Sequence, residues 1–295
     1  MDDIYVSLNE EVRCDFKITT KIKKLWSYQI EIMKEIERIC KKLKIRYFAG
    51  GGTMLGAIRH KGFIPWDDDI DLMMFREDYE IFCKAAPYEL KSQFFLQSAY
   101  TENDYGCPHI KVRNSTTTGA TKYDFGFKYN KGIFVDIFPL DNIPDDDDEF
   151  HQMCENIKRE QRKVDIAVRQ FFYVGNEIIS DKEKEECKSY IDEVGVYRAY
   201  QAVERECTRY MFEKTKRVCC LAFHLNDYVN YNKSDFEKVI HVPFEKTTIC
   251  VPNGYDHFLT ERYGDYMKLV KGGSLHGELI IDFNVPYDKF QLKSE

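Results

Sequence analysis

The sequence lacks several features that would each indicate a class of protein. No stretch approaches the roughly 18 apolar residues of a membrane-spanning helix, and the acidic start Met1-Asp2-Asp3-Ile4 has no apolar core, so we expect no signal peptide. No C-x-x-C pair occurs among the 10 cysteines, which argues against a zinc ribbon. Basic residues are not in excess, since 43 basic and 50 acidic residues give a formal charge of −7, whereas nucleic-acid-binding proteins are usually basic. We therefore expect a cytoplasmic protein with reduced thiols and no nucleic-acid partner.

The chain is long enough to bury a core without disulfides or a metal. Its 295 residues are 43% hydrophobic and 32% charged, an ordinary balance for a globular protein. We expect an α+β fold, with a mixed β-sheet core and flanking helices. The residue pattern predicts three consecutive parts: an N-terminal helical segment over 1–44, a core over 45–145, and a helical region with a C-terminal mixed segment over 146–295 packed on the core.

Hydrophobic periodicity and glycine or proline breaks place the individual elements. Strands are predicted at 46–49, 67–74, 94–97, 109–113, 132–138 and 247–252. Proline at position 139 is expected to end the strand at 132–138. Helices are predicted at 22–43, 54–59, 77–86 and 255–263, with two or three long helices within 149–220.

The polar face of the predicted helix at 22–43 is basic. It carries Lys23, Lys24, Lys34, Lys41 and Lys42. A basic amphipathic helix can lie on an anionic membrane. Glutamates interleave with these lysines, however, and they favour a solvated face.

Alternating aspartates are the first candidate for chemistry. In a strand, alternate residues share a face, so Asp69 and Asp71 would project together with roots about 7 Å apart, Asp67 would precede them, and Asp68 would point the other way. Carboxylates on one face repel one another unless a cation lies between them. Hard oxygen ligands suit Mg²⁺ or Mn²⁺. The alternative is a polar loop after Pro65, which four aspartates between Trp66 and an apolar run disfavour.

Asp136 is the second candidate, because it lies within the apolar run Phe134-Val135-Asp136-Ile137-Phe138. An ionised carboxylate is costly to bury alone. A metal shared with Asp69 and Asp71 would compensate it. The alternatives are a partly exposed aspartate and one paired with a lysine.

A glycine turn is the third candidate. Gly51-Gly52-Thr53 follows a predicted strand and precedes a helix, where glycines let backbone amides approach a phosphate. A glycine turn, a short helix and a strand with two alternating carboxylates form the layout of the nucleotidyltransferase fold. Arg59 and Lys61, between the turn and the aspartates, are candidates to neutralise phosphate charge.

A further pair of basic residues alternates on a predicted strand. Lys111 and Arg113 occur in His109-Ile110-Lys111-Val112-Arg113. They are candidates to clamp a phosphate. A solvated strand face explains the same pattern.

Several blocks of the chain together resemble the LicD family of phosphocholine transferases, which is distantly related to fukutin-type sugar phosphate transferases. The first block is the nearly gap-free run from Gly51 to Asp71, the second is 134–141, and the third comprises 251–255 and 263–267. The resemblance implies a nucleotidyltransferase-like fold for 45–145. It implies that Asp69 and Asp71 hold a metal, with Asp67 beside them and Asp136 as the carboxylate of a further strand. The chain departs from the family after Met267, where its basic stretch is thinner, and His276 is the match for a family histidine.

The resemblance also implies a reaction. Phosphocholine, or a similar phospho-substituent, would pass from CDP-choline or a related CDP-linked donor to a sugar hydroxyl of a surface glycan such as lipopolysaccharide or teichoic acid, with Asp67 or Asp136 accepting the proton. A glycolipid acceptor would bring the cytoplasmic protein into peripheral contact with a membrane. Three alternatives remain: transfer of a nucleotidyl or a sugar or polyol phosphate group on the same fold, a metal-dependent glycosyltransferase, and a non-catalytic binding protein.

Overall fold

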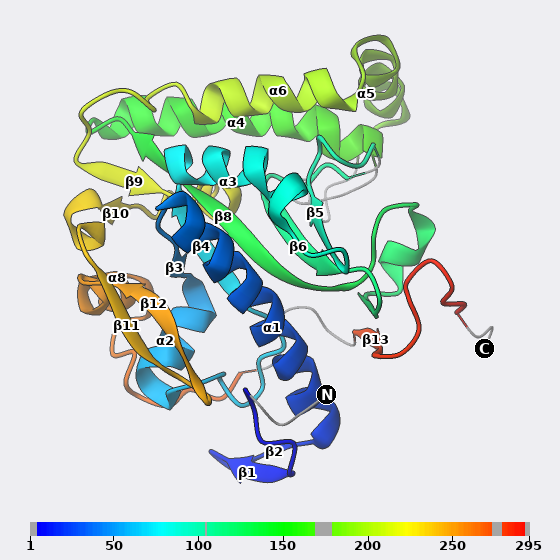
Figure 1. The fold of residues 1–295 in the computed structure, drawn as a ribbon. Coiled ribbons are helices and arrows are strands. Elements are labelled where there is room, and N and C mark those ends of the chain that lie inside the picture. The colour runs from blue at the N-terminus through cyan, green and yellow to red at the C-terminus, as the bar shows by residue number, and fades with distance from the viewer. Residues whose placement is uncertain (1–4, 104, 169–178, 273–278, 293–295) are drawn as a thin grey trace. The chain divides into compact units, whose positions relative to one another are not determined.

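The computed structural model describes residues 5–103, 105–168, 179–272 and 279–292 (Figure 1). The chain forms two compact units. The first comprises Met1–Leu96, Lys111–Phe138 and Ser234–Glu295, and the second comprises Gln97–Ile110 and Pro139–Lys233. This division differs from the consecutive parts 1–44, 45–145 and 146–295 expected from the sequence. The N-terminal helix and the C-terminal segment belong to the same unit as the predicted core, because their apolar side chains are buried in it.

The first unit contains most of the strands and the helices around them. Its helices are α1 (Thr20–Leu43), α2 (Gly51–His60), α3 (Arg76–Glu89), α8 (Tyr255–Tyr263) and the short η1 (Tyr123–Gly126). Its strands are β1 (Glu11–Arg13), β2 (Phe16–Ile18), β3 (Phe48–Ala49), β4 (Asp71–Phe75), β5 (Phe94–Gln97), β6 (Ile110–Asn114), β7 (Thr118–Ala120), β8 (Ile133–Ile143), β11 (Val239–Phe244), β12 (Thr247–Pro252) and β13 (Ile280–Asp282). Of these, β5, β6 and β8 extend into the second unit, which includes Gln97, Ile110 and the end of β8 from Pro139. The predicted α+β class, a multi-stranded sheet with flanking helices, is confirmed.

The sheet of the first unit brings the two aspartate-bearing strands together. β3 pairs antiparallel with β4, with Phe48 opposite Met73, and β4 neighbours β8. The backbone amide of Asp136 on β8 donates to the carbonyl of Ile70, just before β4, at 3.0 Å. On its other side β8 pairs with β6, and β6 pairs with β5. The residues of β8 are all buried, as expected for a strand with neighbours on both sides and both faces covered.

The second unit is mainly helical. It contains α4 (Asp147–Val168), α5 (Asp181–Val194), α6 (Val196–Cys207), the short α7 (Leu221–His224), β9 (Arg217–Cys219) and β10 (Tyr231–Asn232), with η2 (Lys233–Phe236) following. Figure 1 shows α4 and α6 lying side by side. A buried apolar cluster that includes Phe150, Ile157, Val203 and Leu225 forms its core. The long helices predicted within 149–220 are thereby confirmed.

The strand predicted at 132–138 was expected to end at Pro139. β8 instead continues to Ile143, where its last residues pair antiparallel with β9, with Asp141 opposite Cys219. Proline lacks only the amide donor, so the chain can stay extended through it when the flanking residues supply the ladder bonds. β8 thus pairs with β9 beyond Pro139.

The polar face predicted for the N-terminal helix is solvated at Lys41 and Lys42 but not along its whole length. Lys23 is buried and its ammonium lies 2.7 Å from Glu11, while Lys34 and Lys41 lie 2.7 and 2.8 Å from the two carboxylate oxygens of Glu37. The helix has buried residues around most of its circumference. This helix is therefore a packed element of the first unit, and neither a membrane-bound nor a fully solvated face describes it. Within the described residues, none of the helices has the length and apolar content needed to cross a bilayer.

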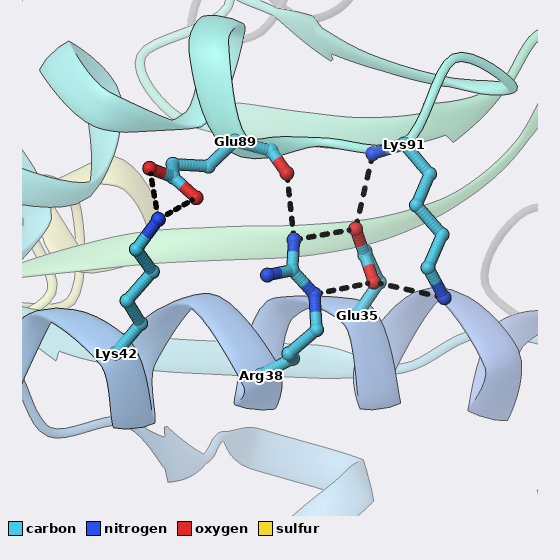
Figure 2. A network of polar contacts seen from close by, with 5 residues as sticks. All are labelled: Glu35, Arg38, Lys42, Glu89 and Lys91. Atoms are coloured by element: carbon cyan, nitrogen blue, oxygen red, sulfur yellow. Dashed lines mark hydrogen bonds and ion pairs between the residues drawn. The ribbon is translucent and has the colours of Figure 1, made fainter.

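Charged residues join α1 to the end of α3 (Figure 2). The buried carboxylate of Glu35 accepts from Nε and Nη2 of Arg38, at 3.0 and 2.9 Å, and from the backbone amide of Lys91 at 3.0 Å. Arg38 also donates to the carbonyl of Glu89 at 2.6 Å, and Lys42 binds the carboxylate of Glu89 at 2.7 Å. This network fixes α1 against the residues that lead from α3 into β5.

We expect Glu35→Gln to lower the free energy of unfolding at pH 7 by about 1–3 kcal/mol, the usual value for a hydrogen bond to a charged group. Burial alone would raise the pKa of Glu35, but Arg38 and Lys91 outweigh it and lower that pKa. A lowered carboxyl pKa stabilises the fold above the ordinary value, about 4.3, and this contribution disappears as the pH falls through the folded-state pKa. Urea unfolding of both proteins at pH 7 and pH 3 measures the difference, which should shrink in acid. Glu80→Gln, at an exposed pair with Lys84, is the control; an equal loss at both pH values would contradict the assignment.

Candidate active site

The aspartates that follow Trp66 form a cluster in the first unit. Carboxylate oxygens of Asp67, Asp68 and Asp69 all lie within 4.8 Å of one another. Each of these side chains is half-buried. Asp68 was expected to point away from the others, and that expectation is wrong.

The cluster extends to the neighbouring strands. Burial raises the pKa of Asp71 well above the ordinary range, and the carboxylates of Asp69, Asp136 and Asp67 raise it further, in that order, while Lys111 lowers it. The structure therefore brings together all four aspartates that the sequence singled out. A set of carboxylate oxygens with this excess of negative charge is the donor set that a hard divalent cation fits.

The segment before β4 is a loop, although a strand was expected from Asp67. Its carbonyls are bound by side chains of α1: Nε1 of the fully buried Trp26 donates to the Asp67 carbonyl at 2.9 Å, and Nε2 of Gln29 donates to the Asp68 carbonyl at 2.7 Å. Carbonyls held in this way are not available to a neighbouring strand. Because the loop does not alternate like a strand, Asp68 can join its neighbours.

The glycine turn faces the aspartates. α2 begins at Gly51, earlier than the predicted start at Met54, so the glycines form the first turn of the helix. A Cβ on Gly51 would lie 3.7 Å from Oδ2 of Asp71, and a Cβ on Gly52 would lie 3.0 Å from Oδ2 of Asp67. The backbone amides of a helix N-terminus and several carboxylates thus line the same place.

Thr53 has a positioning contact in this turn. Its hydroxyl accepts a hydrogen bond from the backbone amide of Asp71 at 2.9 Å, and its side chain is buried. The bond joins the first turn of α2 to the first residue of β4. Thr53 was predicted to bind substrate; in the structure its hydroxyl holds the strand that carries Asp71.

We expect Gly52→Val to weaken donor binding by at least about tenfold while changing the melting temperature by only a few degrees. The added Cβ would lie 3.0 Å from Asp67, closer than ordinary contact, so this carboxylate must move and the path of a phosphate to the amides narrows. Titration with a CDP-linked donor measures affinity and thermal unfolding measures folding. Gly126→Val is the matched control, because a Cβ there meets nothing within 4 Å. Equal donor affinity in the two variants would refute a phosphate role for the turn.

Asp136 has a lysine partner. Nζ of Lys111 lies 2.5 Å from Oδ1 of Asp136, and it lies 4.0 Å from the ring centroid of Phe134. The side chains of Lys111 and Asp136 are 12% and 4% exposed. Asp136 is therefore paired with a lysine, which was one of the alternatives. It also lies close enough to Asp71 to interact with it electrostatically. Arg113 is buried and donates to the carbonyl of Gly132 at 2.8 Å, so its guanidinium is bound to backbone.

The cations expected between the glycine turn and the aspartates lie elsewhere. Lys61 is an exposed residue at the C-terminal end of α2, about 15 Å along the helix axis from Gly51. Arg59, in the last turn, donates to the carbonyls of Tyr266 and Lys268 at 2.9 and 3.2 Å. Arg59 still interacts electrostatically with Tyr263. His276 falls outside the described residues.

Sequence reasoning missed residues that complete the site. Trp26 and Gln29 hold the aspartate loop, and no periodic signal in a helix distinguishes them from core residues. The hydroxyl of Tyr263, at the end of α8, lies 3.8 Å from the position of a Cβ on Gly51. Nε of Arg262 donates to this hydroxyl at 3.3 Å. Tyr263 does belong to the third block that resembles the LicD family, so a signal for it existed.

Comparison with known proteins assigns the segment that contains this site. Residues 44–173 match the family described as LicD/FKTN/FKRP, nucleotidyltransferase domain. This segment is similar to the nucleotidyltransferase domain of that family. It contains the glycine turn, the aspartate loop, Lys111 and Asp136, whereas Trp26 and Tyr263 lie outside the matched residues.

Individual relatives extend the likeness beyond residues 44–173. The chain is 27% identical over 246 residues to lipopolysaccharide cholinephosphotransferase LicD of Haemophilus influenzae, an alignment that covers 81% of this chain and 89% of that protein. Over 74 residues it is 42% identical to an uncharacterized protein of Rickettsia prowazekii, covering 25% of this chain and 27% of the relative. It is 53% identical over 34 residues to human ribitol 5-phosphate transferase FKRP, 12% of this chain and 7% of that protein.

Proposed function

We propose that this protein transfers phosphocholine from CDP-choline, or a similar phospho-substituent from a related CDP-linked donor, to a sugar hydroxyl of lipopolysaccharide or a similar surface glycan. The observation that carries the proposal is the gathering of Asp67, Asp69, Asp71 and Asp136 around the glycine turn of a segment that is similar to the LicD-family domain. The alignment with the cholinephosphotransferase of Haemophilus influenzae, which spans most of both chains, supports phosphocholine as the transferred group.

Each part of the site has a role in this reaction. The backbone amides at the start of α2 bind donor phosphate oxygens, because the glycines leave the amides accessible. An acceptor hydroxyl attacks the phosphorus next to choline, the bond to the CMP oxygen breaks, and CMP leaves. The hydroxyl proton passes to Asp67 or Asp136.

A divalent cation belongs to the proposal, with Mg²⁺ or Mn²⁺ preferred by oxygen ligands. Asp69, Asp71 and Asp136 are the proposed ligands, with Asp67 beside them. The fit rests on the carboxylates of Asp69, Asp136 and Asp67, which add to burial in raising the pKa of Asp71. When bound, such a cation supplies positive charge to the phosphoryl oxygens and to the leaving phosphate.

Incubation of the purified protein with CDP-choline and Mg²⁺ tests the proposal. We expect CMP release that requires a lipopolysaccharide glycan acceptor, incorporation of labelled choline into that acceptor, and loss of both with EDTA. Release of CMP without choline incorporation, or no release with any glycan, would contradict phosphocholine transfer. Lipid-linked and free glycans in parallel show whether the acceptor must be at a membrane.

A polyol phosphate is the second candidate for the transferred group. The match to human ribitol 5-phosphate transferase FKRP covers only 34 residues but at 53% identity. CDP-ribitol should therefore be assayed beside CDP-choline under the same conditions. A kcat/KM that is higher for CDP-ribitol would favour this candidate, and the site model would stay unchanged.

A further inference from the structure

A diphosphate donor faces an electrostatic problem at this site. Asp67, Asp69, Asp71 and Asp136 repel an anionic donor, because like charges close together are unfavourable. The glycine turn supplies dipoles but no full charge. The residues that the sequence offered as counter-charges, Arg59 and Lys61, are placed at the other end of α2. Lys111 is paired with Asp136, so a further cation at the glycine turn would come from another part of the first unit.

The end of α8 supplies one. The point where Gly51 would carry a Cβ has two side-chain atoms within 4 Å: Oδ2 of Asp71 at 3.7 Å and the hydroxyl of Tyr263 at 3.8 Å. Nε of Arg262 lies 3.3 Å from that hydroxyl, and its guanidinium carbon lies 5.5 Å from the centroid of the Tyr263 ring. Arg262 is half-buried. A residue more than 200 positions away in sequence thus brings a guanidinium near Gly51.

We propose that Arg262 and Tyr263 form the phosphate-binding arm for the donor, gripping the diphosphate of a nucleotide-linked substrate against the glycine turn. This inference rests on the proposed function in that it takes the donor to be a nucleoside diphosphate derivative. Gly51 leaves room over the turn because it has no side chain, and its φ of +39° is one that other residues rarely adopt.

The chemistry of the two side chains fits this role. A guanidinium matches phosphate oxygens in a planar, two-pronged geometry that lysine cannot reproduce. The phenol of Tyr263 is a donor to a phosphate oxygen when protonated, and its hydroxyl lies 3.8 Å from the Cβ position on Gly51. Together they place one positive charge and one neutral donor beside Gly51, next to Asp71.

Two variants of the full-length protein test the arm. Arg262→Lys keeps the charge and removes the two-pronged geometry, and Tyr263→Phe removes only the hydroxyl. We expect Arg262→Lys to weaken binding of CDP in the presence of Mg²⁺, and to raise the KM for CDP-choline, by at least about tenfold, as expected for a lost hydrogen bond to a charged group. Tyr263→Phe should raise the Kd for CDP and the KM for CDP-choline about three- to tenfold. The kcat should change less than KM in each case.

Matched controls are Arg209→Lys, at an exposed ion pair with Glu206, and Tyr88→Phe, at a tyrosine that is 90% exposed. Melting temperatures within about 2 °C of the parent would exclude a folding defect, and Arg262→Gln serves if the lysine variant is unstable. CDP binding that is unchanged in both arm variants would overturn the inference. If CDP binding depends on the arm while CDP-choline gives no CMP, phosphocholine transfer fails and the arm stands.

Discussion

Asp71→Asn should reduce turnover by at least about 100- to 1,000-fold while leaving the metal-free protein at least as stable as the parent. The amide keeps the shape of the carboxylate but loses its charge, and metal stabilisation of transition-state charge is worth several kcal/mol, of which each 1.36 kcal/mol is a factor of ten. Acceptor-dependent CMP release from CDP-choline measures the turnover. A structural aspartate would give the opposite pattern, with retained activity and a lower melting temperature.

The stability half of this expectation follows from the direction of the pKa shift. Burial, together with Asp69, Asp136 and Asp67, raises the pKa of Asp71. A raised carboxyl pKa means that the folded state binds the proton more tightly than the unfolded chain, so this group destabilises the fold as pH rises above about 4, the ordinary value for aspartate. Asn removes the penalty. In thermal unfolding in EDTA, the melting temperature of the variant relative to that of the parent should be higher at pH 8 than at pH 5.

The control for Asp71 must come from outside the cluster. Asp68 is unsuitable, because its carboxylate lies within 4.8 Å of those of Asp67 and Asp69. Asp192 on α5 is exposed and lies 3.4 Å from Lys188. We expect Asp192→Asn to leave CMP release unchanged. Near-normal turnover by Asp71→Asn would refute the proposed metal role.

Lys111→Gln should lower the free energy of unfolding by about 3–5 kcal/mol, the cost of leaving one member of a buried ion pair without its partner. The carboxylate of Asp136 is 4% exposed and would lose the ammonium 2.5 Å away. For a protein of this size the loss corresponds to a melting temperature lower by about 10 °C. Differential scanning calorimetry in EDTA measures it.

The same variant separates the lysine from the metal as counter-charges of Asp136. Addition of Mg²⁺ should raise the melting temperature of Lys111→Gln more than that of the parent, because a ligand that binds only the folded state stabilises it in proportion to its affinity. Lys188→Gln, at an exposed pair, should change stability by no more than about 0.5 kcal/mol. If Mg²⁺ raises the melting temperatures of Lys111→Gln and the parent equally, Asp136 is not a metal ligand whose charge Lys111 balances.

Local patterns in the sequence were sufficient for most elements of the fold. The helix predicted at 22–43 is observed as Thr20–Leu43, and the elements predicted at 94–97, 247–252 and 255–263 are observed with those bounds. Apolar periodicity and terminal glycines determine these elements locally. The strand expected to end at Pro139 failed because its continuation depends on pairing with β9, a strand more than 70 residues later.

The site shows the same division between local and long-range information. The sequence indicated that these carboxylates would meet, and they do because Asp71 and Asp136 lie on neighbouring strands, with Asp67 and Asp69 in the loop that leads into the first of them. The strand assigned to Asp67–Ile70 was wrong because Trp26 and Gln29 bind the carbonyls of that segment. Nothing within 67–71 carries that information. Arg59 and Lys61 were chosen for their proximity in sequence, and a ten-residue helix then carried them away from the turn.

The two hydrogen bonds from α1 to the aspartate loop determine how small a working piece of this protein can be. The family match covers 44–173, yet the side chains that hold the loop precede it and the tyrosine over Gly51 follows it. A fragment trimmed to the matched residues would keep every aspartate and lose the groups that orient them. In evolutionary terms, an insertion between α1 and β3 that shifted the helix by one turn would remove both hydrogen bonds from the aspartate loop without altering any aspartate.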